Sequence, residues 1–334
     1  MNLSARRCVQ RCILWLLIGA IPTVTAGAVE VPSRWREEWP RTDFSKLRVP
    51  VSEVQTGGPP RDGIPSIDRP EFRPIDLVTG MADREPVIAL SINGDARAYP
   101  LRVMIWHEIV NDIVGGVPVA VTYCPLCNAA IVFDRRVEGR TLSFGTTGKL
   151  RYSDLVMYDR ETESWWQQFT GNAIAGELAD RELVMLPSRL EAWEKFKASA
   201  PTGFVLVPND PTLRPYGANP YVGYEGGKVP FLYKGPFPRG IRPMQRVIVV
   251  GDKAWSLALL QEKGRIDDGQ LRLEWIPGQA SALDRDKIAA GRDVGNVVVK
   301  RREGDDMAEI PHAVTFAFVY FAFNRDTSIF STLE

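Results

Sequence analysis

Short runs of apolar, often β-branched residues separated by turn residues dominate the chain from residue 86 onward. Residues 87–92 and 96–99 flank Asn93-Gly94, a pair that favours the type I′ turn of a β-hairpin. Further strand-like runs occupy residues 117–123, 130–134, 141–144, 155–158, 245–250, 271–275, 296–301 and 315–323. The pattern predicts an α+β fold that is β-rich, with a mainly antiparallel mixed sheet, a few short helices and long Pro/Gly-rich loops.

Helical spacing of apolar residues is confined to short segments. Ile105, Ile109 and Ile113 predict a helix over residues 101–113, which Gly115-Gly116 would end. We expect two more helices, over residues 189–198 and from a cap at Asp252 to Leu260. Residues 208–243 are rich in Pro, Gly and Tyr over a length that exceeds a simple turn, so they predict a packed irregular loop.

The amino-terminal segment has the pattern of a signal peptide. Three arginines precede an apolar run at residues 13–21, which is too short to span a bilayer, and small residues follow at Ala26-Gly27-Ala28. We expect cleavage near Ala28 and export to the periplasm or the extracellular space. The alternative is an uncleaved membrane anchor.

The remaining chain divides into an arm and a domain. Residues 29–75 are rich in Pro, Gly and charge and predict an extended arm that Trp35 and Trp39 attach to the surface. Residues 76–334 predict a single domain, without a transmembrane span in the mature chain.

Composition excludes some functions. Of 334 residues, 41 are basic and 41 acidic, so no positive excess points to a nucleic acid partner. No motif indicates a nucleotide cofactor. The partner stays unknown, with a small molecule or another exported protein as candidates.

Two cysteines carry the candidate chemistry. Signal cleavage removes two of the four cysteines and leaves Cys124 and Cys127. In an oxidising compartment such a pair is expected to be a disulfide, a metal site or a redox couple. Two thiolates separated by two residues in a tight turn can bind one ion, and Asn128 tolerates the left-handed backbone that this turn needs. The arrangement is similar to the metal knuckles of rubredoxins and zinc ribbons, although those have two knuckles and this chain has one.

The other ligands must come from elsewhere in the chain. His107 precedes the strand that leads to Cys124, so we predict a metal site of Cys124, Cys127 and His107. Thiolates are soft ligands, which favours copper or zinc over magnesium or calcium. His312 and Met157 are candidates for a fourth ligand.

Two alternatives remain open, and whether the protein is an enzyme is left undecided. Cys124 and Cys127 could be the nucleophilic and resolving thiols of a thiol–disulfide redox protein, although the following residues predict a strand rather than the helix of a thioredoxin-like site. The pair could also be structural, in a non-catalytic binding module that uses the Tyr- and Pro-rich residues 216–233.

Several longer motifs carry a family resemblance. They are the runs at residues 107–112, 121–127, 144–148, 153–162 and 164–167, together with Thr170-Gly171 and the aromatic stretch at 316–326. Over roughly residues 75–330 the chain resembles the bacterial family catalogued as domain of unknown function 3179 (DUF3179). The resemblance implies a single family domain, often exported, and supplies no activity.

The same motifs offer further polar residues. Residues 145–149 could bind an anion through backbone donors, but strand threonines beside a hairpin turn are the favoured reading. Asp154 and Asp159 could orient His107 or a metal ligand, or could act only in turns and caps. Trp165 and Trp166 are expected in the core.

Overall fold

The computed structural model describes residues 30–332, so the predicted signal peptide lies outside the described part of the chain. Within that part, no helix is long and apolar enough to cross a membrane. The α-helices are short: α1 (Ser33–Glu38), α2 (Leu101–His107), α3 (Trp193–Ser199), α4 (Leu257–Lys263) and α5 (Ala317–Phe323). Single 3₁₀ turns occur at Phe44–Lys46, Val51–Glu53, Ile75–Leu77 and Ile288–Ala290.

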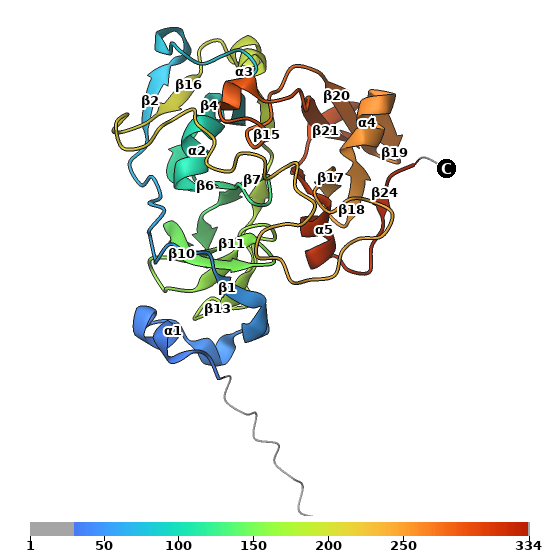
Figure 1. The fold of residues 1–334 in the computed structure, drawn as a ribbon. Helices are drawn as coiled ribbons and strands as arrows, with labels where there is room; N and C mark the ends of the chain where they lie inside the picture. Colours follow the sequence, from blue (N-terminus) through green and yellow to red (C-terminus); the bar gives the residue numbers. More distant parts are fainter. Residues whose placement is uncertain (1–29, 333–334) are drawn as a thin grey trace, which may run out of the picture.

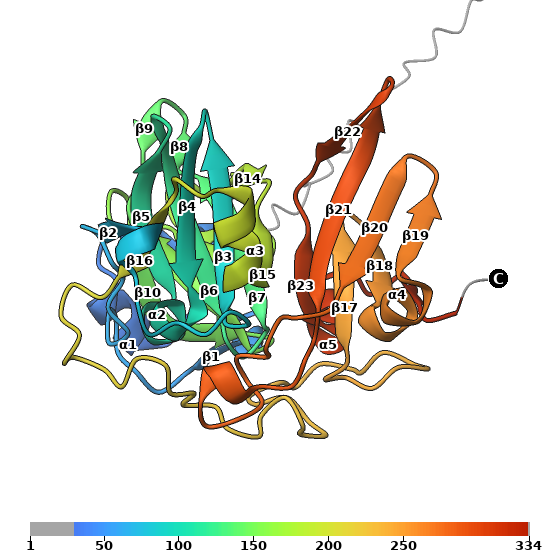
Figure 2. The same ribbon diagram turned by 90° about the horizontal axis from the view of Figure 1, so that it is seen from above.

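The strands form small sheets in two lobes, which Figure 2 shows side by side. The larger lobe runs from α1 to β16. Its first sheet has the order β1 (Val54–Thr56), β10 (Phe144–Arg151), β11 (Asp154–Asp159), β12 (Trp165–Gln167) and β13 (Ala173–Ala175). Its second has the order β14 (Met185–Leu186), β7 (Ala129–Asp134), β6 (Val117–Cys124) and β5 (Ile109–Val114). Its third has the order β15 (Arg189–Ala192), β3 (Pro86–Ile92), β4 (Asp95–Pro100), β16 (Phe204–Val207) and β2 (Glu71–Pro74), and a ribbon pairs β8 (Arg136–Val137) with β9 (Arg140–Thr141).

The smaller lobe holds the strands from β17 onward. One sheet has the order β23 (Ala313–Phe316), β17 (Arg246–Val250), β18 (Lys253–Ser256) and β24 (Ile329–Phe330). The other has the order β19 (Arg265–Asp268), β20 (Leu271–Ile276), β21 (Asn296–Glu303) and β22 (Asp306–Glu309). Among the paired strands of the described chain, β16 with β4 and β18 with β24 are parallel and the others antiparallel. The prediction of a β-rich, mainly antiparallel fold with few short helices is therefore confirmed.

The hairpin predicted at Asn93-Gly94 is present, and both residues have the positive φ of a type I′ turn, at 51° and 82°. The helix predicted over residues 101–113 is wrong in its second half. It ends at His107, where Glu108 has a φ of 60°, and the chain continues as β5. β-branched residues pair well in a sheet, and β5 pairs along its whole length with β6.

Other predicted elements are wrong at similar junctions. Residues 189–198, predicted as a helix, begin as strand β15 and continue as α3, and residues 315–323, predicted as a strand, begin in β23 and continue as α5. Asp252 does not cap a helix, because β18 intervenes and Ser256 caps α4 by accepting a hydrogen bond of 3.1 Å from the Leu259 amide. In each case the helix begins at the residue directly after the strand. One continuous apolar run therefore covers both elements, and its pattern does not show where the strand ends and the helix begins.

One arrangement occurs in both lobes, although the sequence alone did not reveal it. A hairpin, a seven-residue helix and a strand follow one another as β3-β4-α2-β5 in the larger lobe and as β17-β18-α4-β19 in the smaller. Each helix ends at a residue of positive φ, which is Glu108 in the first and Gly264 in the second. Glycine adopts this backbone without strain and glutamate does not.

Residues 208–243 contain neither helix nor strand, which confirms the predicted irregular loop, and the loop crosses the front of the molecule in Figure 1. The largest apolar cluster includes Val121 and Phe133 of the larger lobe with Val247 and Phe316 of the smaller. In the arm, the side chains of Trp35 and Trp39 are buried against Trp165, as expected.

Candidate metal centre

The cysteine turn connects β6 to β7. Cys124 is the last residue of β6, and the Cys127 amide donates a hydrogen bond of 3.2 Å to the Cys124 carbonyl. The Asn128 amide donates to the Pro125 carbonyl at 3.1 Å, and Asn128 has a φ of 52°. The left-handed backbone expected at Asn128 is therefore confirmed, and the turn brings both sulfurs to one side.

Strand β23 of the smaller lobe holds this turn in place. The Thr315 hydroxyl and the Phe316 amide both donate to the Cys127 carbonyl, at 2.8 and 3.2 Å. The Asn128 side-chain amide donates to the Val314 carbonyl at 3.0 Å. The cysteine turn is thus fixed by both lobes.

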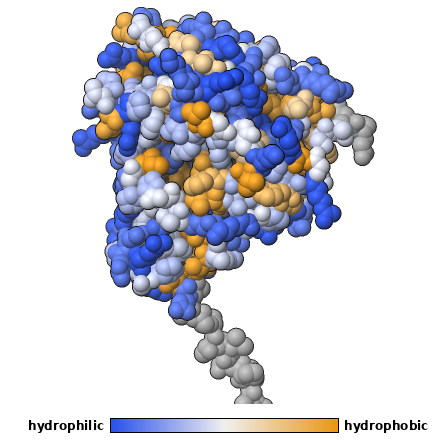
Figure 3. Space-filling view, in the orientation of Figure 1, coloured by the Kyte–Doolittle hydropathy of each residue, from blue (hydrophilic) through white to orange (hydrophobic). Residues whose placement is uncertain are grey.

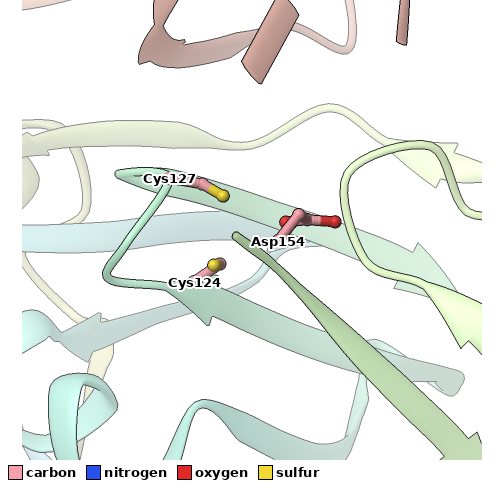
Figure 4. A group of neighbouring side chains, drawn as sticks. All are labelled: Cys124, Cys127 and Asp154. Carbon is pink, nitrogen blue, oxygen red and sulfur yellow. The ribbon is translucent and has the colours of Figure 1, made fainter. Parts of the chain in front are cut away.

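A second turn, at Tyr152-Ser153, faces the cysteines. Its backbone is strained, and its Ser153 carbonyl contacts both sulfurs. Between β10 and β11, Tyr152 and Ser153 have φ of 54° and 67°, which forms a tight hairpin turn without glycine. Both thiols donate to the Ser153 carbonyl, from Cys124 at 3.8 Å and from Cys127 at 3.6 Å. The next residue, Asp154, directs its carboxylate toward the same point (Figure 4).

Cys124, Cys127 and Asp154 form a group whose ligand atoms all lie within 4.8 Å of one another, and all three side chains are buried. One carboxylate oxygen of Asp154, Oδ2, accepts hydrogen bonds from the Gln167 side chain at 2.5 Å and from the Phe169 amide at 2.9 Å. The other oxygen, Oδ1, is buried and has no hydrogen-bond partner among the described residues. A buried carboxylate oxygen without a partner is costly, and a cation would satisfy it.

Burial weakens the acidity of the whole group. It raises the pKa of the Cys124 thiol and raises that of Cys127 well above its ordinary value, with the adjacent Cys124 contributing to the second shift. Burial also raises the pKa of Asp154 to about 6, against the hydrogen bonds that favour its charged form. Without a cation, the site therefore favours neutral thiols at neutral pH.

The structure does not bring His107 into this group of three. Its Nδ1 donates to the Pro65 carbonyl at 2.8 Å, which leaves Nε2 as the acceptor of a 2.8 Å hydrogen bond from the Tyr216 hydroxyl. Both ring nitrogens are thus engaged, and the role of His107 as a ligand stays a prediction. His312 is buried elsewhere, with Nδ1 against the Ile310 carbonyl at 3.2 Å.

Sequence reasoning passed over Glu108. This residue takes the strained helix-end position that glycine occupies in the smaller lobe, and it is 7% exposed. Residues 30–332 form no hydrogen bond with its carboxyl group. Burial, with a smaller contribution from the charge of Asp154, raises the pKa of Glu108 to about 8. A strained, buried and unpartnered acid beside a metal-ligand group is typical of a functional site.

The remaining motif residues lie outside this group of three. Thr146 and Lys149 flank a bulge in β10, where the Lys149 ammonium forms an ion pair of 2.7 Å with Glu38 and the Lys149 amide donates to the Thr147 hydroxyl at 2.9 Å. Trp165 and Trp166 are fully buried, as expected. Asp159 accepts hydrogen bonds from the Trp166 ring nitrogen and from Thr162 at the far end of β11.

Fold and site together define a class of protein: a β-rich, two-lobed protein with a buried Cys-Cys-Asp group that could hold a metal ion. The chain belongs to the family described as "Protein of unknown function (DUF3179)", whose model matches residues 61–327. The match confirms the resemblance and begins within the arm. No curated protein and no solved structure matches the chain.

Proposed function

We propose that this protein is an exported metal-binding protein that holds a zinc or copper ion between Cys124, Cys127 and Asp154. The observation that carries the proposal is the buried Asp154 carboxylate, which places a ligand oxygen within 4.8 Å of two thiol sulfurs and whose Oδ1 has no hydrogen-bond partner among the described residues. A plain structural pair of cysteines does not by itself require a buried carboxylate beside both sulfurs. The predicted signal peptide supports the exported part of the proposal.

The distances within the group suit a small coordination sphere. In a tetrahedral zinc site with Zn–S bonds of about 2.3 Å, two sulfurs lie about 3.8 Å apart. The three ligand atoms are already within 4.8 Å of one another, so a modest side-chain adjustment would close the site. The fourth position would be open to water or to another ligand, as in catalytic rather than structural zinc sites.

The donor set favours one metal over the other. Two thiolates make the site soft, which disfavours magnesium and calcium. A carboxylate is a hard ligand that zinc accepts more readily than copper(I) does. We therefore propose zinc as the preferred occupant and copper as its competitor.

The redox alternative has less support. A nucleophilic cysteine needs a lowered pKa, which a helix amino terminus or a nearby cation supplies. Here burial raises the pKa of both thiols, and Cys124 ends a strand. A bound cation would instead stabilise both thiolates, as the metal proposal requires.

The test is metal analysis of the full chain, expressed with its signal segment and without a polyhistidine tag, and purified under reducing conditions. We expect one zinc ion per chain by elemental mass spectrometry. Replacement of that ion by cobalt should give thiolate charge-transfer absorption and the visible bands of a tetrahedral site. Absence of stoichiometric metal after incubation with zinc and with copper(I) would refute the proposal.

Matched variants locate the ion. Cys124→Ser, Cys127→Ser and Asp154→Asn should each lower metal affinity by at least about tenfold, because each removes a ligand. Asp159→Asn is the control, since Asp159 is also buried on β11 but bonds to Trp166 and Thr162. Equal loss in the Asp159 variant would point to a general disturbance of β11.

A further inference from the structure

A pocket of about 530 Å³ lies against the candidate metal centre. Its lining includes Leu126 and Leu155, which are the sequence neighbours of Cys127 and Asp154. Its walls come from three separate segments: residues 57–64 of the arm, β10, and residues 220–231 of the irregular loop. This volume lies within the range of pockets that bind small organic molecules.

The lining is largely apolar and aromatic. Tyr221, Tyr224 and Phe231 contribute rings, and Leu126, Leu150 and Leu155 contribute aliphatic surface. Apolar residues also gather near the middle of the face shown in Figure 3, the face that the irregular loop crosses in Figure 1. The one lysine of the lining, Lys149, is neutralised by its ion pair of 2.7 Å with Glu38. An apolar, aromatic body fits such a lining better than a charged one.

Two polar groups of the pocket have no hydrogen-bond partner within residues 30–332: the Glu108 carboxyl and the Tyr221 hydroxyl. Both residues line the pocket, and the Tyr123 amide donates a hydrogen bond of 2.8 Å to the Glu108 carbonyl, so Glu108 lies beside the strand that ends at Cys124. By contrast, the hydroxyl of the neighbouring Tyr224 is engaged, because it donates to the Leu126 carbonyl at 2.9 Å. Glu108 is buried and Tyr221 is half-buried, and a pocket that presents two such unpartnered polar groups suits a ligand that pairs with both.

We propose that the pocket binds a small, uncharged aromatic alcohol or phenol, whose hydroxyl donates to Glu108 and accepts from Tyr221. A hydroxyl is the smallest group that both donates and accepts, so it matches a carboxyl oxygen and a tyrosine hydroxyl together. Bound there, the hydroxyl would lie on the side of the pocket next to the Cys-Cys-Asp group. The proposal depends on the pocket alone and does not require a bound metal.

The test is calorimetric or NMR titration of the metal-free, reduced full chain with four matched probes. 4-Ethylphenol should bind about tenfold more tightly than 4-ethylanisole, which only accepts hydrogen bonds, or ethylbenzene, which does neither. 4-Ethylbenzoate should bind more weakly than 4-ethylphenol, because the pocket offers it no free cation. Equal binding of 4-ethylphenol and ethylbenzene, or tighter binding of the benzoate, would overturn the proposal.

A conservative variant tests the proposed hydrogen bond from Tyr221 to the ligand hydroxyl. Tyr221→Phe removes one hydroxyl from a half-buried loop residue, and it should reduce the preference for 4-ethylphenol over ethylbenzene several-fold. Tyr233→Phe is the control, because Tyr233 belongs to the same loop, does not line the pocket and donates to the Pro236 carbonyl at 2.7 Å. If Tyr221→Phe kept the wild-type preference for 4-ethylphenol over ethylbenzene, the proposed hydrogen bond from Tyr221 would be refuted. Since these titrations use metal-free protein, their failure is distinguishable from failure of the metal proposal.

Discussion

Gln167 donates a hydrogen bond of 2.5 Å to Oδ2 of Asp154 and leaves Oδ1 of the same carboxylate without a partner. The two residues come from neighbouring strands, since β11 pairs with β12. Together with the Phe169 amide, Gln167 fixes the orientation of the carboxylate. Oδ2 accepts both hydrogen bonds, and Oδ1 has no partner among the described residues that would compete with an ion. Residues that orient a metal ligand in this way contribute strongly to affinity although they never touch the ion.

Gln167→Met should therefore lower zinc affinity by about tenfold to a hundredfold, because the Asp154 carboxylate loses a hydrogen bond that orients it. The measurement is a competition titration against a chromophoric chelator. Gln168→Met is the matched control, since Gln168 is equally buried but donates to Thr122 and to the Ala129 carbonyl. If both variants lose affinity equally, the effect is one of packing and the orienting role is wrong.

His107→Gln tests the ligand set predicted from the sequence. Because both ring nitrogens already bond to Pro65 and Tyr216, we expect metal stoichiometry to stay at the wild-type value. The free energy of unfolding should fall by about 1 kcal/mol, because the half-buried Pro65 carbonyl and Tyr216 hydroxyl lose their hydrogen bonds to the ring. Elemental analysis and denaturant unfolding measure the two effects. Loss of the ion in this variant would instead place His107 in the ligand set.

The cysteine turn could be predicted because its determinants are local. Cys124, Pro125, Cys127 and Asn128 lie within five residues, and each has a direct consequence for the backbone or for the ligand chemistry. The hairpin at Asn93-Gly94 is predictable for the same reason. In both cases one short segment contains the whole signal.

Asp154 could not be assigned as a candidate ligand in this way. It reaches the cysteines only because the turn at Tyr152-Ser153 packs against the turn between β6 and β7, and that contact is tertiary. Tyr-Ser also lacks the Asn or Gly that usually marks a tight hairpin turn, so the turn itself gave no signal. Glu108 was missed because the helix was expected to continue through it. A strained glutamate becomes visible only when its φ is known.

Thr315→Val tests whether the smaller lobe supports the cysteine turn. The substitution removes a hydroxyl that donates to the Cys127 carbonyl at 2.8 Å, while the Phe316 amide still satisfies that carbonyl. We expect a loss of about 1 kcal/mol in the free energy of unfolding and a decrease of up to about tenfold in zinc affinity. Thr327→Val is the control for affinity, because the Thr327 hydroxyl donates to the nearby Asn324 carbonyl and not to the cysteine turn. Zinc affinity equal to wild type in Thr315→Val would show that the lobes are not coupled through this bond.

The irregular loop that walls the pocket is attached by Glu225, whose buried carboxylate pairs with Arg246 at 2.8 Å and also contacts Arg292 and Ser281. Burial alone would raise the pKa of Glu225, but the charges of Arg246 and Arg292 and the hydrogen bonds from Arg246 and Ser281 together outweigh it and lower the pKa from 4.5 to about 2. A carboxyl whose pKa is lower in the folded state stabilises the fold above its ordinary pKa and loses this contribution as the pH falls toward the folded value. Glu225→Gln should therefore cost roughly 3 kcal/mol at pH 7, and the difference from wild type should shrink as the pH falls through about 4 toward about 2. Denaturant unfolding at several pH values measures this, with exposed Glu262→Gln as the control. A deficit that stays constant with pH would mean that Glu225 stabilises the loop through packing and not through its charge.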